Sequence, residues 1–256
     1  MSSCFQNAIF APKIRKTMHH FYCPDIHSSL QLTEEESAHA IRVLRLGIGD
    51  EIEVFDGNGH ICTAIIEQAH PKHTSVRITQ TSHIPKNRDY TIAIAIAPTK
   101  NMDRLEWFVE KACEIGIDRI TPIICHYSER KICKTDRLHK IIISAIKQSH
   151  QAYMPILDET MTFDEWLSTV HAEQKCIAHC YKDATKIELT KKDVINKNIS
   201  LAIGPEGDFS EKEIKRALQK GFTSVSLGEN RLRTETAGIV ACHTIHVLNQ
   251  LVKKTT

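Results

Sequence analysis

The 256-residue chain lacks the sequence patterns of several common protein classes. No apolar run approaches the roughly 20 residues that a membrane-spanning helix needs, so we expect a cytoplasmic protein with no membrane partner. The nine cysteines form no Cys-x-x-Cys pair, which argues against a zinc ribbon and favours a reducing compartment over a disulfide framework. The G-x-G-x-x-G and G-x-x-x-x-G-K loops are also absent, which argues against Rossmann and P-loop nucleotide sites.

The charge balance is close to neutral, at a formal net charge of +2. This is too small to indicate nucleic-acid binding, which is usually marked by a concentrated basic face. Two local clusters remain as candidates, one over residues 130–140 and the other at Arg42 and Arg45. For each of them, an ordinary solvated set of basic side chains is the alternative interpretation.

One group of possible metal ligands occurs near the middle of the chain, at Cys176, His179 and Cys180. If these residues lie on a strand, alternation places His179 on the face opposite to both cysteines. A shared ion needs all its ligands on one side, so we predict no metal site.

The length and pattern of the chain predict two domains. Residues 18–84 are typical of a small β-rich domain, with alternation at Glu51–Phe55 and a hairpin turn at residues 56–59. A single helix is predicted there, because Thr33 and Glu36 have the spacing of a capping box. It places Arg42 and Arg45 where they can face solvent or phosphate.

The polar, proline-containing residues 84–90 are predicted to be a linker. From residue 91 to 256, apolar strands alternate with amphipathic helices, which predicts an α/β domain with a parallel sheet. Residues 1–17 are basic and lack acidic residues; we interpret them as an extension that precedes a true start at Met18, with a transit peptide as the alternative.

The candidate chemistry lies in residues 201–238, LAIGPEGDFSEKEIKRALQKGFTSVSLGENRLRTETAG. A buried strand ends at Ile203, and a turn beginning at Gly204 follows, since glycine adopts positive φ readily. Ser210 and Glu213 predict a capped helix with Ile214, Ala217 and Leu218 on its apolar stripe, ended by Gly221. A second strand over residues 222–227 then leads to Gly228. Ordinary turn glycines are the alternative interpretation.

These motifs closely resemble those of the RsmE-type 16S ribosomal RNA uridine-N3 methyltransferases. The resemblance includes GPEG after an aliphatic strand and then LG and LRTETA. It extends to HAIRVLR, GD and DG in the N-terminal half, and to EIG and TP in the centre. One departure is His150 and Gln151, where the family pattern has Gly-Arg, and this puts an RNA or substrate role of that loop in doubt.

The resemblance implies a trefoil-knotted SPOUT methyltransferase domain, preceded by a PUA-like β-barrel that binds RNA. It also implies S-adenosyl-L-methionine (SAM) as cofactor, a homodimer, and 16S rRNA of the small ribosomal subunit as substrate. The cofactor would lie among three strand-end loops, after His179, Ile203 and Leu227. The residues carried over as its contacts are Ile203, Gly204, Glu206, Gly207, Leu227, Gly228, Leu232 and Arg233.

Methylation at N3 of uracil requires loss of the N3 proton. Glu235 or Glu206 could accept this proton, and Arg233 could stabilise the charge on the uracil oxygens. The alternative for Arg233 and Glu235 is an ion pair that stabilises the start of the following helix. Two other functions stay open: a related SPOUT enzyme that methylates ribose 2′-oxygen or another base, and a non-catalytic RNA-binding protein.

Overall fold

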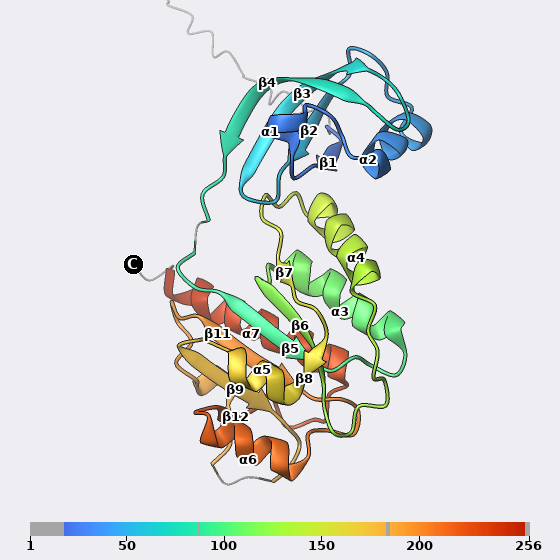
Figure 1. Ribbon diagram of the computed structural model, residues 1–256. Helices are drawn as coiled ribbons and strands as arrows, with labels where there is room; N and C mark the ends of the chain where they lie inside the picture. The colour runs from blue at the N-terminus through green and yellow to red at the C-terminus, as the bar shows by residue number, and fades with distance from the viewer. Residues whose placement is uncertain (1–17, 87, 183–184, 254–256) are drawn as a thin grey trace, which may run out of the picture. The chain divides into compact units, whose positions relative to one another are not determined.

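The computed structural model describes residues 18–86, 88–182 and 185–253 (Figure 1). The predictions for residues 1–17 therefore lie outside the described part. The chain divides into two compact units: one contains residues up to 55 together with 61–82, and the other contains residues 56–60 together with 83 onward. In the described part, no helix is long and apolar enough to cross a bilayer.

The N-terminal unit is built on a four-stranded sheet in the order β1-β2-β3-β4. Its strands are β1 (His20–Tyr22), β2 (Glu51–Phe55), β3 (His60–Gln68) and β4 (Ser75–His83). β1 pairs with β2 in parallel, and β2 pairs with β3 in antiparallel fashion. The alternation in β2 buries Ile52 and Val54 in the core of the unit, as its sequence predicts.

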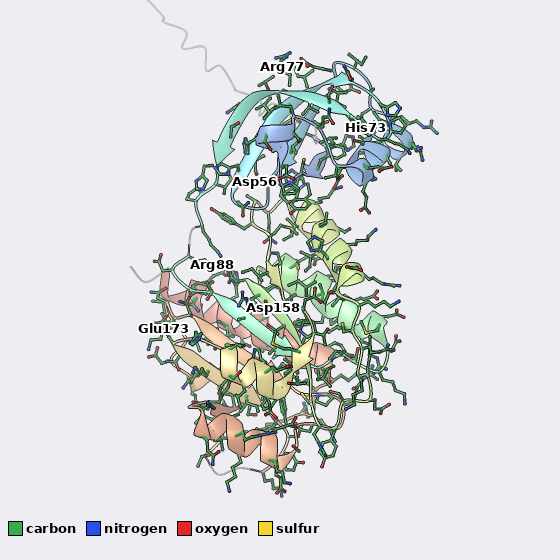
Figure 2. The ribbon with its side chains drawn as sticks, in the orientation of Figure 1. Asp56, His73, Arg77, Arg88, Asp158 and Glu173 are labelled. Carbon is green, nitrogen blue, oxygen red and sulfur yellow. The ribbon has the colours of Figure 1, made fainter. Side chains whose placement is uncertain are left out.

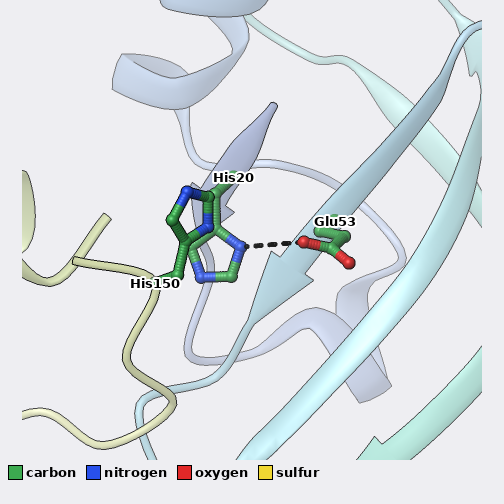
Figure 3. Close-up of side chains that lie close together, drawn as sticks. All are labelled: His20, Glu53 and His150. Carbon is green, nitrogen blue, oxygen red and sulfur yellow. Dashed lines mark ion pairs between the residues drawn. The ribbon is translucent and has the colours of Figure 1, made fainter. Parts of the chain in front are cut away.

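The β1–β2 pair carries a buried histidine (Figure 3). Nδ1 of His20 lies 3.5 Å from a carboxylate oxygen of Glu53, and its ring stacks on Phe55 with the centroids 4.6 Å apart. Histidine is often only partly buried, and here Glu53 and Phe55 hold the buried ring in place.

Three short helical segments complete the unit: α1 (Ile26–Ser29), α2 (Glu34–Ala38) and the π-helix η1 (His39–Val43). The predicted capping box of α2 is only half formed. Thr33 Oγ1 accepts from the backbone N–H of Glu36 at 3.3 Å, but a Glu36 carboxylate oxygen accepts from the N–H of Tyr22. Glu36 therefore ties α2 to β1 instead of closing its own cap.

The C-terminal unit contains an eight-stranded sheet in the order β10-β12-β9-β11-β5-β6-β7, with β8 paired to β6. The strands are β5 (Ile92–Ile96), β6 (Arg119–Ile124), β7 (Ile156–Leu157), β8 (Met161–Thr162), β9 (Gln174–Ala178), β10 (Ile187–Glu188), β11 (Ile199–Ile203) and β12 (Thr223–Ser226). The pairings are parallel, which confirms the predicted sheet type. β11 is buried throughout, as expected of a central parallel strand.

Helices cover both faces of this sheet (Figure 1). They are α3 (Met102–Ile115), α4 (Thr135–Gln148), α5 (Phe163–Thr169), α6 (Glu211–Gln219) and α7 (Thr234–Lys253), with a 3-10 turn η2 (Leu189–Lys191). Ala95 faces the core formed with α5 and α6. Its neighbour Ile96 faces the other side, where a Cβ on Gly238 of α7 would lie 3.2 Å from the Ile96 side chain. Successive residues of β5 thus serve opposite layers.

Helix α6 largely follows its sequence prediction. Ser210 and Glu213 form the full capping box, and Gly221 has the left-handed φ of +83° expected just after a helix. The prediction was wrong for Leu218, which is 41% exposed, whereas Ile214 and Ala217 are buried. The buried apolar face of α6 is therefore narrower than the sequence predicts.

The predicted linker has no regular secondary structure at its described residues, and it is anchored to the C-terminal unit. Nη2 of Arg88, labelled in Figure 2, lies 2.8 Å from Oδ1 of Asp118, and its guanidinium lies over the Tyr90 ring at 5.2 Å. Lys86 also pairs with Asp118. The carboxylate of Asp118 therefore fixes the chain where it enters β5.

Candidate active site

The C-terminal unit has a cavity of roughly 1120 Å³ at the carboxyl ends of its central strands. Residues 178–182 and Lys186 lie at and after the end of β9, and residues 203–206 and Asp208 lie at and after the end of β11. Residues 225–234 and Ala237 run from β12 into α7. Ligand sites in open parallel sheets form at this edge, because the strand ends and their loops meet there. The structure thus brings together the three loops that the resemblance names.

The GPEG turn is shaped by close packing, and not by the positive φ predicted for its glycine. Neither Gly204 nor Gly207 has a positive φ; the left-handed residue is Asp208, at +67°. A Cβ on Gly204 would lie 3.1 Å from the ring of buried Phe209, and one on Gly207 would lie 2.9 Å from Cβ of Tyr127. Glycine is needed here because neighbouring side chains leave no room.

Asp208 joins two of the loops. Its Oδ2 accepts from the backbone N–H of Cys180 at 2.8 Å, and its Oδ1 accepts from the N–H of Phe209 at 2.8 Å. Aspartate tolerates the left-handed conformation better than most residues, since its short side chain bonds to the local backbone. The carboxylate therefore connects the loop after β9 to the GPEG turn.

A second link fixes the start of α7. Thr234 is buried, and its Oγ1 donates to the carbonyl oxygen of Gly204 at 3.0 Å. The guanidinium of Arg231 also donates to the carbonyl of Glu206 at 3.3 Å. These bonds hold Arg231 and the LRTETA segment against the GPEG turn, so the two parts of the cavity wall are joined directly.

The third loop carries the glycine with the unusual conformation. Gly228 has φ of +125°, and a Cβ built there would meet no heavy atom within 4 Å. Its carbonyl accepts from Ser226 Oγ at 2.9 Å. Its backbone thus faces open space beside Leu227, and both residues line the cavity.

The candidate catalytic residues occupy different surroundings. Glu206 and Arg233 are exposed and line the cavity. A Glu206 carboxylate oxygen accepts from the N–H of Lys100 at 3.0 Å. Glu235 is only 7% exposed and is not among the lining residues. Its ion pair is with Arg104 of α3, 4.0 Å away, and not with Arg233 as the alternative interpretation has it.

The predicted cofactor contacts Ile203, Gly204, Glu206, Leu227, Gly228, Leu232 and Arg233 all line the cavity, whereas Gly207 does not. Sequence reasoning missed Asp208, Lys186 and Thr234. The capping pattern beside Asp208 marks a helix start, but nothing local indicates that its carboxylate reaches the β9 loop. Lys186 is equally unmarked, although its Nζ donates to the carbonyls of His179 and Tyr181 at 2.7 and 2.6 Å.

Within the group of Cys176, His179 and Cys180, the histidine has a structural role. Nε2 of His179 lies 2.9 Å from Oγ of Ser224, which joins β9 to β12. Burial raises the pKa of Cys176 to about 11, so its thiol stays protonated at neutral pH. A thiol is a poor metal ligand until it loses its proton.

In the N-terminal unit, Arg42 and Arg45 are both exposed, at and just after η1. Within the described residues neither arginine has an ion pair, and Glu34 lies 3.9 Å from Lys72 instead. Arg45 adopts a left-handed φ of +55°. Within the described residues, Arg42 and Arg45 therefore form no ion pair with the acidic residues of the preceding helix α2.

Comparison with known proteins assigns both parts of the chain. A family described as RNA methyltransferase domain matches residues 86–246, and one described as RNA methyltransferase PUA domain matches residues 32–79. The chain belongs to the RNA methyltransferase family. The resemblance found in its motifs is thereby confirmed.

Named relatives of this RNA methyltransferase agree with the family match. "Ribosomal RNA small subunit methyltransferase E" of Rickettsia conorii is 29% identical over 224 residues, covering 87% of this chain and 91% of the relative. The protein of that name from Bacillus subtilis is 24% identical, covering 88% and 92% of the two chains.

Two solved structures share the fold over most of their length. A "probable rRNA-methyltransferase" from Porphyromonas gingivalis is 39% identical with a TM-score of 0.84, covering 92% of this chain and all of the other. The ribosomal RNA small subunit methyltransferase E of Neisseria gonorrhoeae, solved with S-adenosyl methionine bound, is 26% identical with a TM-score of 0.78 and covers 90% and 98%.

The loop that departs from the family pattern has a structural role in this RNA methyltransferase. The side-chain amide of Gln151 donates to the carbonyl of Cys113 at 2.7 Å, near the end of α3. His150 has a left-handed φ of +52°. Gln151 therefore satisfies a helix-terminal carbonyl, a role that needs no RNA.

Proposed function

We propose that the chain is a SAM-dependent methyltransferase that methylates N3 of a specific uridine in 16S rRNA of the small ribosomal subunit. The observation that carries this proposal is the cavity built from the loops after β9, β11 and β12. A relative of the same fold was solved with SAM, and the curated relatives are named for the small-subunit rRNA.

The residues of the cavity fit this cofactor. Its volume of roughly 1120 Å³ is ample for a nucleoside with an amino-acid tail. Leu227 and Leu232 offer apolar surface for an adenine ring, and the exposed backbone of Gly228 can approach a ligand closely. The carboxylates of Glu206 and Asp208 suit a ligand that carries positive charge. When bound, SAM supplies an electrophilic methyl group on a sulfonium.

The protein's part in the reaction is to position and deprotonate the uracil. Methyl transfer is an in-line displacement, so most of the catalysis comes from holding N3 in line with the methyl. Glu206 is the favoured proton acceptor because it lines the cavity, whereas Glu235 is buried in contact with Arg104. Arg233 stabilises the negative charge left on the uracil oxygens. The target base must be unpaired, since N3 is occupied in a Watson–Crick pair.

The organisation of the molecule is part of the same proposal. Residues 18–84 form a PUA-like domain that docks RNA through Arg42 and Arg45, and residues 91–256 form the SPOUT domain. The chain is threaded as a trefoil knot and acts as a homodimer. The match to the PUA family and the exposure of both arginines support RNA docking by the N-terminal unit.

The deciding experiment is mass spectrometry of nucleosides from 16S rRNA of a deletion strain. We expect one 3-methyluridine to disappear and to return when purified protein and SAM are added to that RNA. Loss of a ribose 2′-O-methyl or of another base methyl would assign a different SPOUT activity. RNA binding without SAM binding would identify a non-catalytic protein.

A further inference from the structure

Two partly exposed tyrosines, Tyr181 and Tyr127, lie in the cavity lining and next to it, respectively. Tyr181 lies in the loop after β9, lines the cavity and is 37% exposed. Tyr127 follows β6 and is 47% exposed. Its Cβ lies 2.9 Å from where a Cβ on Gly207 would be, between the lining residues Glu206 and Asp208. Asp208, which follows Gly207 in the chain, accepts from the N–H of Cys180, the residue before Tyr181, so the segments that carry the two rings meet at this carboxylate.

The turn that carries Tyr127 is firmly held. The N–H of Ser128 donates to the carbonyl of Cys125 at 3.1 Å, and the N–H of Cys125 donates to Ser128 Oγ at 2.9 Å. The N–H of His126 donates to a carboxylate oxygen of Glu213 at 2.8 Å. Glu213 is only 3% exposed, and its other oxygen caps α6. The Tyr127 side chain, 47% exposed, is therefore presented on a backbone that is held by hydrogen bonds.

The backbone at Tyr181 is also held by hydrogen bonds. The ammonium of Lys186 donates to the carbonyl of Tyr181 at 2.6 Å. The preceding residue, Cys180, donates its N–H to Asp208 at 2.8 Å. Exposed aromatic side chains on rigid loops bind a flat partner with little loss of conformational freedom.

The surroundings of the two rings indicate what that partner is. Lys182, Arg231 and Arg233 are exposed and line the same cavity. Stacking rings beside positive charges are typical of surfaces that bind single-stranded nucleic acid, where bases stack and phosphates are neutralised. The apolar faces of the tyrosines alone would not distinguish a protein from an RNA, but the positive side chains favour RNA.

We propose that Tyr127 and Tyr181 form a stacking platform for unpaired bases of the RNA substrate at the cavity mouth. This inference rests on the proposed function, because it assumes an RNA whose target base enters the cavity. It adds a binding role for side chains outside the GPEG and LRTETA motifs. The rings act by their flat faces, so their hydroxyl groups are dispensable.

The test compares Tyr127→Ala with Tyr127→Phe in the full chain. Affinity for 16S rRNA from a deletion strain is measured by filter binding, and SAM affinity by calorimetry. We expect Tyr127→Ala to weaken RNA binding roughly 5- to 100-fold, the range for loss of one stacked base, with SAM affinity unchanged. Tyr127→Phe should bind RNA within about twofold of wild type. Tyr181→Ala should weaken RNA binding more than SAM binding.

The salt dependence of RNA affinity tests the same variants in a second way. No charge is removed, so the ratio of wild-type to Tyr127→Ala affinity should stay constant as the salt concentration rises, while both affinities fall. A ratio that shrinks with salt would show that the substitution disturbs the charged residues, and would overturn stacking as the cause. Equal losses in the Ala and Phe variants would overturn it too, since the hydroxyl would then be the contact.

The outcome separates this inference from the proposed function. If wild-type protein methylates the RNA and Tyr127→Ala binds it equally well, only the stacking platform is refuted. If the wild-type protein binds no RNA, both proposals fail. Tyr127→Ala protein with normal RNA affinity but lost binding to another protein would assign the rings to that partner instead.

Discussion

The loops around the cavity are fixed by hydrogen bonds, whereas the basic segment of the N-terminal unit, which contains Arg42 and Arg45, is exposed to solvent. Asp208 and Thr234 join the cavity loops by hydrogen bonds to backbone groups, so that wall is fixed. Arg42 and Arg45 instead extend into solvent without an ion pair in the described part of the chain. A small cofactor needs a preformed site of defined shape, whereas phosphates are bound by charges whose exact placement matters less.

The largest effect is expected where the cavity wall loses its shape. Gly228→Val should weaken SAM binding about 100-fold or more, because a β-branched residue resists φ of +125° and its side chain would enter the cavity. Gly204→Val should have a similar effect by displacing Phe209. Calorimetry with SAM is the measurement.

Gly221→Val is the matched control for these variants. Gly221 also has a positive φ and open space around it, but it lies outside the cavity. It should lower stability and leave SAM affinity intact. Unchanged SAM affinity in folded Gly228→Val protein would remove that loop from the site.

The next largest effect concerns Arg233, a charged residue that lines the cavity. Arg233→Ala should lower the rate of methyl transfer roughly 100-fold, while SAM affinity changes little, because its partner is charge that develops on uracil. Single-turnover assays with saturating SAM would measure the rate. An equal loss in both quantities would make Arg233 a cofactor ligand. Arg231→Ala is the neighbouring comparison, since that guanidinium already donates to Glu206.

One buried carboxylate joins the start of α6 to the turn after β6. Glu213 accepts hydrogen bonds from Ser210 and from the N–H of His126. Glu213→Ala should lower the free energy of unfolding by about 1.5 to 3 kcal/mol, since hydrogen bonds to a charged group are lost. Urea unfolding is the measurement, and Glu211→Ala on the same helical turn is the control. Equal stability of the two variants would contradict a bridging role.

Substitutions in the basic segment should weaken RNA binding and leave SAM binding unchanged. Replacing Arg42 or Arg45 by Ala should weaken RNA binding across sequences and flatten the salt dependence by a slope of about one for each lost phosphate contact. SAM affinity should stay the same. Filter binding at several salt concentrations tests this. An unchanged slope in the folded double variant would place RNA docking elsewhere.

The smallest effect concerns α7, whose first turn borders the cavity. Burial lowers the pKa of His246, and the charges of Arg88 and His243 lower it further. Because the unfolded chain then binds the proton more tightly, stability is full above the ordinary histidine pKa of about 6.5 and falls as the pH drops through that value. His246→Gln should flatten this part of a stability profile measured by urea unfolding between pH 5 and 8. An identical profile would contradict the assignment.

Local features of the sequence were enough to predict much of the C-terminal unit. The apolar runs predicted to be strands form the parallel strands β5, β6 and β11. They could be recognised because a strand covered on both faces must be apolar throughout. The Ser210 and Glu213 box and Gly221 were predicted correctly because capping depends on neighbours within a few residues. The motifs also sufficed to name the family.

Tertiary structure decided the features that depend on residues far apart in sequence. It assigned the left-handed position to Asp208, because packing of Phe209 and Tyr127 against the glycines sets the shape of the turn. It paired Glu235 with Arg104 instead of its neighbour Arg233. It also placed Tyr181 in the cavity lining and Tyr127 beside Gly207 of the GPEG turn. Local propensity acts over a few residues, whereas these contacts arise only when the sheet aligns the ends of its strands.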